Sequence, residues 1–336
     1  MIILGVQHMF AMFGATILVP ILTGLDISTT LLMAGLGTLL FHCITKFKVP
    51  AFLGSSFAFL GGYAAIKAFS PNDPNSMLPY ACLGVACAGL IYFILAAVIK
   101  AVGIEKVMRF FPPVVTGPII IAIGLGLAPS AVSNCTTNWF LAVVALAVIV
   151  VFNIWGKGMA KIIPIILGLL ISYGTGLVLY FISQANPDLI QNVPWLFSGG
   201  ADANGVYQPI FDFTSLNTIC DNISKGHIFG SEGLIGIPIH WDKTVFGGID
   251  YSNGALIASS IIAIVPIAFA TMMEHIGDIC AISSTTGNNY IKDPGLHRTL
   301  VGDGLATTLA SLFGGPANTT YGENTGVLAL TRVYDP

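Results

Sequence analysis

Charged residues are scarce in this chain, and their scarcity excludes most classes of soluble protein. Only 9% of its 336 residues are Asp, Glu, Lys or Arg, whereas 55% are hydrophobic. With a mean hydropathy of +0.84, the composition lies outside the range of soluble globular domains. The net charge of −3 is small and its charges are scattered, which argues against nucleic acid as a partner. The chain is therefore expected to lie in the lipid bilayer.

Two further absences restrict the chemistry. The six cysteines have no histidines at metal-ligand spacing, and most of them lie inside apolar stretches. The sequence also lacks a pattern that pairs a nucleophile with a base, as an enzyme would need. We therefore predict no metal site, no cofactor and no enzymatic activity.

Long apolar runs recur along almost the whole chain, whereas a signal peptide would supply only one. Together with their polar breaks, these runs predict an all-α polytopic membrane protein with ten spans, two of them irregular. The predicted spans are residues 3–22, 28–45, 50–69, 78–99, 112–131, 138–156, 162–183, 256–284, 299–313 and 322–332.

Basic residues are unevenly distributed between the two sides of the predicted membrane. Ten of the 13 lysines and arginines lie at alternate connections, and only Lys67, Lys225 and Lys243 lie on the other side. This bias follows the positive-inside rule. It predicts a multi-pass protein of the cell (inner) membrane with a cytoplasmic N-terminus and an external connection over about 185–255.

Two predicted spans are not apolar from end to end. The third begins KVPAFLGSSFAFLGGY and the tenth begins GGPANTTYGENTGVL. Non-helical backbone at membrane depth is tolerated only where it is buried in protein or lines a polar cavity. Interrupted segments at corresponding places of two repeats indicate a transporter binding site, and a period of seven spans would make these two correspond.

Few ionisable residues lie well inside the apolar runs. Glu274 and Asp278 lie one helical turn apart, and Glu323 lies in the tenth segment. Each such acid costs about 3 kcal/mol at a helix centre, so it usually serves a function. Two close carboxylates hold a proton readily, which makes Glu274 and Asp278 candidates for proton coupling. His275 is an alternative partner that would neutralise Glu274, and Asp303 is more typical of a structural hydrogen-bonding residue.

The two breaks offer groups that fit a flat ligand with alternating donors and acceptors. Exposed N–H groups at the start of a half helix donate to ligand carbonyls. Glu323 either caps that helix or accepts from the N–H groups of the ligand, and the two roles can coexist. Phe57 and Tyr321 are placed to contact a flat ring, with core packing as the alternative for Phe57.

Five stretches resemble the nucleobase:cation symporter 2 family, also called the nucleobase–ascorbate transporters, and most closely its bacterial uracil permeases. They are QHMFAMFGATILVP at 7–20, PAFLGSSFAF at 50–59, EHIGD at 274–278, DPGLHR at 293–298 and NTTYGENTGVLALTRVY at 318–334. The resemblance covers nearly the whole chain apart from 185–255.

The resemblance implies a fold of two inverted seven-span repeats, with short β-strands in the interrupted segments three and ten. It assigns residues 1–110 to core-domain spans 1–4, 111–184 to gate-domain spans 5–7, 185–255 to an external loop and 256–336 to core-domain spans 8–10. By that pattern the second repeat is incomplete and the sequence is C-terminally truncated. In the full-length protein, a homodimer through the gate is expected.

The resemblance further implies import of uracil by proton symport, with sodium as the alternative ion. The implied substrate-binding residues are Glu274, Glu323, Phe57, Gly322, Tyr321 and Ala15. The two glutamates would accept hydrogen bonds from the base, and the backbone of Phe57 and Gly322 would donate to its carbonyl oxygens. Ala15 and Tyr321 would line the site.

Two positions point to different substrates within the family. Uracil permeases often have histidine at position 278, whereas purine carriers have aspartate, as this sequence does. At position 323, xanthine and urate carriers usually have glutamine, so Glu323 favours uracil. A xanthine or other purine symporter is therefore one alternative. An anion carrier or channel would need a basic group in the breaks, and a receptor would bind the base without transporting it.

Overall fold

The computed structural model describes residue 12 and residues 16–109, 113–157, 159–162, 164–202, 204–214 and 238–334. This part of the chain is mostly helical, with four short strands. It divides into one unit of residues 1–126 and 238–336 and a second unit of residues 127–237. These elements confirm the prediction of a mostly helical membrane protein with a few short strands.

The first unit contains most of the chain, and it includes the two interrupted segments. Its elements are α2 (Ile27–Thr45), β1 (Leu53–Ser55), η1 (Phe57–Phe59), α3 (Leu60–Lys67), η2 (Pro74–Met77), α4 (Leu78–Val102), α5 (Ile104–Met108), η3 (Trp241–Lys243), α13 (Val245–Gly248), α14 (Gly254–Ile264), α15 (Ile267–Thr286), η4 (Ile291–Gly295), α16 (Leu296–Leu312), β4 (Asn318–Thr320) and α17 (Glu323–Thr331).

The second unit is built on a pair of apolar helices. Its elements are α7 (Trp139–Trp155), α8 (Met159–Ile162), α9 (Pro164–Ala185), α10 (Asp188–Asn192), α11 (Pro194–Phe197), β2 (Ser198–Ala201) and β3 (Tyr207–Pro209), and α6 (Pro113–Cys135) runs across the boundary between the units. Helices α7 and α9 pack together, and the Ser172 hydroxyl donates to the Leu141 carbonyl at 3.0 Å. Large apolar side chains such as Leu146 and Leu170 remain exposed, as expected on a lipid-facing surface.

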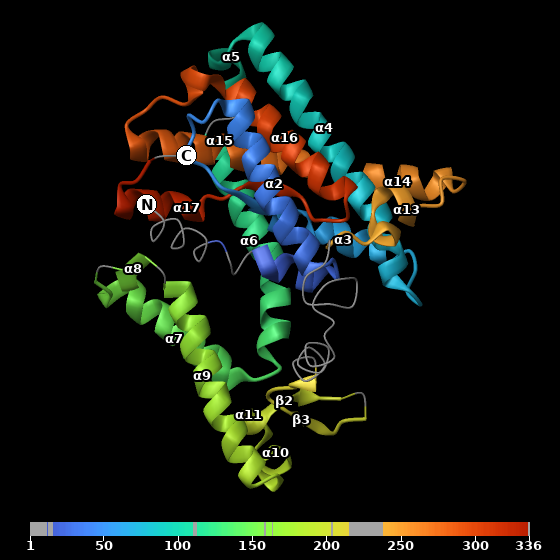
Figure 1. Ribbon diagram of the computed structural model, residues 1–336, viewed down its shortest axis with the longest axis vertical. Coiled ribbons are helices and arrows are strands. Elements are labelled where there is room, and N and C mark those ends of the chain that lie inside the picture. Colours follow the sequence, from blue (N-terminus) through green and yellow to red (C-terminus); the bar gives the residue numbers. More distant parts are fainter. Residues whose placement is uncertain are drawn as a thin grey trace, which may run out of the picture. The chain divides into compact units, whose positions relative to one another are not determined.

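Helix α16 lies between α2 and α4 at the centre of the first unit (Figure 1). Glycines allow this close packing, because a Cβ atom added to Gly304 would lie 2.6 Å from the Gly89 carbonyl oxygen of α4. Small residues at such crossings let backbones approach within a membrane, where lipid supplies no hydrophobic drive for helix association. The residues of LVGDGLATTL therefore serve the packing of α16 against its neighbours.

The interrupted segments pair with each other through β1 and β4. The two strands are antiparallel, with Leu53 opposite Thr320 and Ser55 opposite Asn318. Each strand leads into a half-length helix, since 57–67 follows β1 and α17 follows β4. The pairing satisfies backbone groups that would otherwise be exposed at membrane depth. The expected short strands in segments three and ten are therefore confirmed.

Four helices are long and apolar enough to cross a membrane within the described residues. They are Ile27–Thr45, Pro74–Val102, Ile166–Ala185 and Gly254–Thr286. The second of these joins η2 to α4, and the fourth joins α14 to α15. They coincide with the second, fourth, seventh and eighth predicted spans. Shorter apolar helices occupy Phe57–Lys67 and Trp139–Trp155, within the third and sixth predicted spans.

The end of the predicted external loop packs on the first unit. The Asp250 N–H donates to the Tyr80 hydroxyl of α4 at 3.0 Å, and the Phe246 ring contacts Phe313 with centroids 5.9 Å apart. The Thr29 hydroxyl of α2 donates to the Pro238 carbonyl. The two units thus divide residues 185–255 between them, and they also place 111–126 with the first unit. The assignment of these segments to a core domain, a gate domain and an external loop stays a prediction.

Candidate functional site

The β1–β4 pair holds Tyr321 where the second half helix begins. Its backbone N–H donates to the Phe52 carbonyl at 3.0 Å and its hydroxyl donates to the Ser55 carbonyl at 2.9 Å. The ring stacks on Phe52 with an interplanar angle of 8°. Tyr321 is consequently buried, with 6% of its surface exposed, and Gly322 is the N-cap residue of α17. The strand pair therefore fixes the point where α17 starts.

Helix α15 packs against both half helices, because it contacts η1 and α17. It carries Glu274 and Asp278, which are both half-buried. Asp278 lies beside the start of α17, since a Cβ atom added to Gly322 would lie only 2.7 Å from the Asp278 Oδ1 atom. Helix α15 thus brings Asp278 to the N-terminal end of α17, and it also contacts η1 at the start of the first half helix. Helix N-termini leave N–H groups without intrahelical partners, so this place offers both donors and acceptors.

Thr320, the last residue of β4, links three polar side chains. Its N–H donates to Asp303 Oδ1 at 2.9 Å, and its hydroxyl donates to Asp278 Oδ2 at 3.3 Å. The same hydroxyl oxygen lies 3.1 Å from His275 Nδ1. Because Thr320 pairs with Leu53, the network also fixes the strand pair against α15 and α16.

His275 and Asp303 form the innermost part of this network. Both side chains are fully buried, and His275 Nδ1 lies 3.4 Å from Asp303 Oδ2. The other ring nitrogen, Nε2, lies 3.0 Å from the Thr299 hydroxyl. A buried acid is costly unless it is hydrogen-bonded. Asp303 Oδ1 accepts from the Thr320 N–H, whereas Oδ2 has no hydrogen-bond partner among the described residues. Residues of α15, α16 and β4 are thereby held together through polar contacts.

The structure places four of the six predicted substrate-binding residues on or beside elements that contact one another. Phe57, the first residue of η1, is half-buried, and Glu274 lies on α15, the helix that contacts η1 and α17. Glu323 is the first residue of α17, and its side chain lies outside the described part of the structure. Ala15 also lies outside the described residues. Tyr321 and Gly322 occupy the junction between β4 and α17.

Three contributors to the site were not among the predicted residues. Thr320 connects the strand pair to α15 through Asp278 and to α16 through Asp303, and only the fold shows these connections. Asn324 follows Glu323 in α17, and its amide is 3% exposed without a hydrogen-bond partner among the described residues. A buried amide that lacks a partner is costly and often awaits a ligand or water. Its place in the GENTG stretch is the sequence signal that would have indicated it.

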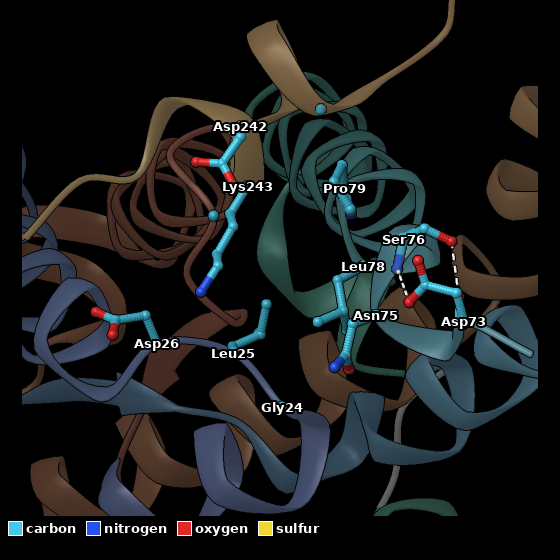
Figure 2. Close-up of a pocket in the computed structure, with 12 residues that line it drawn as sticks. Gly24, Leu25, Asp26, Asp73, Asn75, Ser76, Leu78, Pro79, Asp242 and Lys243 are labelled. Carbon is cyan, nitrogen blue, oxygen red and sulfur yellow. Dashed lines mark hydrogen bonds between the residues drawn. The ribbon is translucent and has the colours of Figure 1, made fainter.

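A separate cavity of about 370 Å³ lies at the ends of helices that are predicted to be external. Lys243 points into it, and Asp73 contacts Ser76 at its rim (Figure 2). Asp26 accepts from the Thr29 N–H at 2.7 Å as the N-cap of α2. Because two of its three acids, Asp26 and Asp73, cap helices, we interpret this cavity as a packing gap beneath residues 238–250. Within the described residues, no three His, Cys, Asp or Glu side chains are placed to hold a metal.

The sequence profile of the Permease family matches this chain over residues 1–336. The chain belongs to this family. The resemblance to the nucleobase:cation symporter 2 family is therefore confirmed, and the chain is a membrane protein of a transport family.

This permease is similar in sequence to proteins named uracil permease or probable uracil permease. The uracil permease of Bacillus caldolyticus is 39% identical over 99% of this chain and 67% of its own length. The probable uracil permease of Haemophilus influenzae is 37% identical over 99% of this chain and 68% of its own length. The permease thus spans about two thirds of the length of these relatives.

A solved structure also aligns with this permease. It is the transmembrane domain of a cyanobacterial bicarbonate transporter, BicA, which is 13% identical with a TM-score of 0.44. The alignment covers 96% of the permease and 77% of that domain.

Proposed function

We propose that this chain forms the substrate-binding part of a secondary active transporter that imports uracil by proton symport. The observation that carries the proposal is the meeting of both half helices with α15, next to Asp278 and Glu274. A pyrimidine edge alternates N–H donors and carbonyl acceptors. The helix N-termini supply donors for its carbonyls, and the carboxylates supply acceptors for its N–H groups.

Uracil is proposed over purines for two reasons. The relatives are named uracil permeases, and Glu323 is an acid at the start of α17, where purine carriers of the family usually have glutamine. Tyr321 and Phe57 are placed at the two junctions to contact a flat ring. Asp278 favours the purine alternative, so xanthine is the competitor to test.

Proton coupling is proposed on Glu274 and Asp278. The two acids lie one turn apart on α15, and Asp278 accepts from Thr320, which also contacts His275 and Asp303. A proton that enters this network neutralises acidic charge beside the substrate and so changes the affinity for the base. Release of the proton on the cytoplasmic side would favour release of the base.

The sidedness and domain roles are likewise proposals. Lys48 and Asp293, from two connections that we place in the cytoplasm, form an ion pair with Nζ to Oδ1 at 2.7 Å. Residues 238–250 meet Tyr80 and Phe313, which we place at the external ends. Each contact joins segments that the proposed topology places on one side of the membrane, whereas the cytoplasmic N-terminus rests on the positive-inside bias. Residues 1–110 and 256–336 would supply the core domain, and residues 111–184 would belong to the gate.

Cells that express the protein are expected to accumulate labelled uracil against its gradient. A protonophore should abolish that accumulation, because the proton gradient would supply the work. Accumulation that survives the protonophore but requires external sodium would replace the proton with sodium. An excess of unlabelled uracil should block uptake, and stronger inhibition by xanthine would assign the site to purines instead.

Replacing Gly322 with alanine is expected to raise the apparent KM for uracil about tenfold or more, because even small misplacement of a site residue is costly. The added Cβ would lie 2.7 Å from Asp278 Oδ1, so either the carboxylate or the start of α17 must move. Initial rates of labelled uptake at several concentrations measure the change. Gly326→Ala is the matched control in the same helix, because its Cβ would meet nothing within 4 Å. An equal effect of both substitutions would contradict this role of Gly322.

A further inference from the structure

The Tyr321 ring lies next to Gly54 of the strand pair, a residue that has no side chain. Gly54 is the central residue of β1, and it lies directly opposite Thr319 of β4. Tyr321 is two residues beyond Thr319 and directly follows β4, so its side chain lies diagonal to Gly54 on the same face. Aromatic side chains reach such diagonal positions in antiparallel pairs.

The Tyr321 ring occupies the space that a side chain at position 54 would need. A Cβ atom added to Gly54 would overlap the Tyr321 Cε2 atom and would lie 2.9 Å from Cζ. The Thr16 hydroxyl oxygen would be 3.0 Å from the same Cβ. Since ordinary contacts of a Cβ atom with carbon begin near 3.5 Å, the ring and a side chain at 54 exclude each other.

The ring has little freedom to yield within its present position. Its hydroxyl donates to the Ser55 carbonyl at 2.9 Å and lies 3.2 Å from the Thr16 hydroxyl. One face stacks on Phe52, and the backbone is tied to the Phe52 carbonyl. A methyl group at 54 would therefore have to expel the ring and break the hydroxyl contact. Because Tyr321 directly precedes Gly322, expulsion would also shift the start of α17.

We infer that Gly54 is a positioning residue for the nucleobase site, which acts by leaving room for the Tyr321 ring against β1. The inference rests on the proposed function for its substrate, and on the contacts of Tyr321 for its geometry. Gly54 itself offers no side chain to the base. It determines where Tyr321 and the N-terminal end of α17 lie, and so acts through them.

The test is a double-mutant cycle of Gly54→Ala and Tyr321→Ala. Gly54→Ala alone should raise the apparent KM for uracil about tenfold or more, with a much smaller change in the maximal rate per transporter in the membrane. In the Tyr321→Ala background, the same substitution should change KM less than about twofold, because no ring remains to be displaced. If the increases in KM caused by the two single substitutions multiply in the double variant, the inference is overturned.

Thermal unfolding in detergent without ligand supplies a second readout. Gly54→Ala should lower Tm by about 3 °C or more in the parent and by much less when Tyr321 is alanine. Gly61→Ala is the control, because an added Cβ there would meet nothing within 4 Å. If Gly54→Ala alone does not fold, recovery of a folded protein by the second substitution supports the inference, and failure of both overturns it.

The two readouts separate this inference from the proposed function. A parent protein that neither binds nor imports uracil would refute the proposed substrate, whereas the Tm cycle would still decide whether the ring and position 54 exclude each other. Conversely, uracil uptake that Gly54→Ala leaves unchanged would refute the positioning role and leave the proposed transport intact. Tyr321→Phe, which keeps the ring and loses the hydroxyl, should remain sensitive to Gly54→Ala.

Discussion

Replacement of Glu323 by glutamine is expected to abolish uracil uptake or to redirect it to purines. Glu323 is the first residue of α17, directly after the Tyr321–Gly322 junction that β1 and β4 hold in place. A carboxylate there accepts hydrogen bonds only, whereas a glutamine amide must present two donors on one of its ends. The altered pattern no longer matches the N–H groups of uracil.

In Glu323→Gln, the maximal rate of uracil uptake divided by KM is expected to fall about 100-fold or more. The reason is that hydrogen bonds to charged groups contribute about 1.5–3 kcal/mol each. Labelled uracil and xanthine, offered separately, measure both the loss and any gain. Glu105→Gln is the matched control, since Glu105 lies exposed on α5. Uptake and selectivity that match the parent protein would remove Glu323 from the site.

Asp303→Ala is expected to destabilise the protein by about 3 kcal/mol and to abolish transport. The substitution leaves the buried Thr320 N–H without its acceptor at 2.9 Å and removes the carboxylate beside His275. Since Thr320 pairs with Leu53, the strand pair would lose its attachment to α16. Thermal unfolding in detergent and labelled uptake measure the two effects.

Asp303→Asn separates the two roles of this carboxylate. An asparagine keeps an acceptor for the Thr320 N–H and removes the charge, so stability should recover in large part. If transport remains lost, the charge serves the proposed proton coupling; if transport returns, Asp303 is structural. Asp188→Ala, on the exposed surface of α10, should change stability by less than about 0.5 kcal/mol. A similar loss of stability in both alanine variants would contradict the role of the buried network.

Several features of the fold followed from local sequence. Apolar runs at 28–45, 78–99 and 256–284 correspond to long helices, because a membrane span needs about 20 apolar residues and satisfies its own backbone. The polar breaks at PAFLGSSFAF and NTTYGENTG marked the interrupted segments, and family resemblance indicated their strands. The acids at 274, 278 and 323 stood out because ionisable residues are costly in apolar runs.

Other features depend on partners that are distant in sequence. His275 was considered as a partner of its neighbour Glu274, yet its ring nitrogens contact Thr299 and Thr320 and lie near Asp303. Adjacent residues on a helix point in different directions, so spacing alone could not choose between these contacts. Residues 238–250 were likewise expected in one external loop, and their attachment to Tyr80 depends on the packing of α4.

The sequence by itself determined that this chain is a membrane protein, where its long apolar helices run, where two segments break, and which acids fall inside apolar runs. Composition and periodicity suffice for these conclusions, because hydrophobic length and the cost of buried charge are local quantities. Only the tertiary structure decided which groups meet. Thr320 contacts Asp278 and Asp303, and the Tyr321 ring occupies the space that a side chain at position 54 would need. Those contacts join residues more than 15 positions apart, and they form only when the two interrupted segments pair beside α15 and α16.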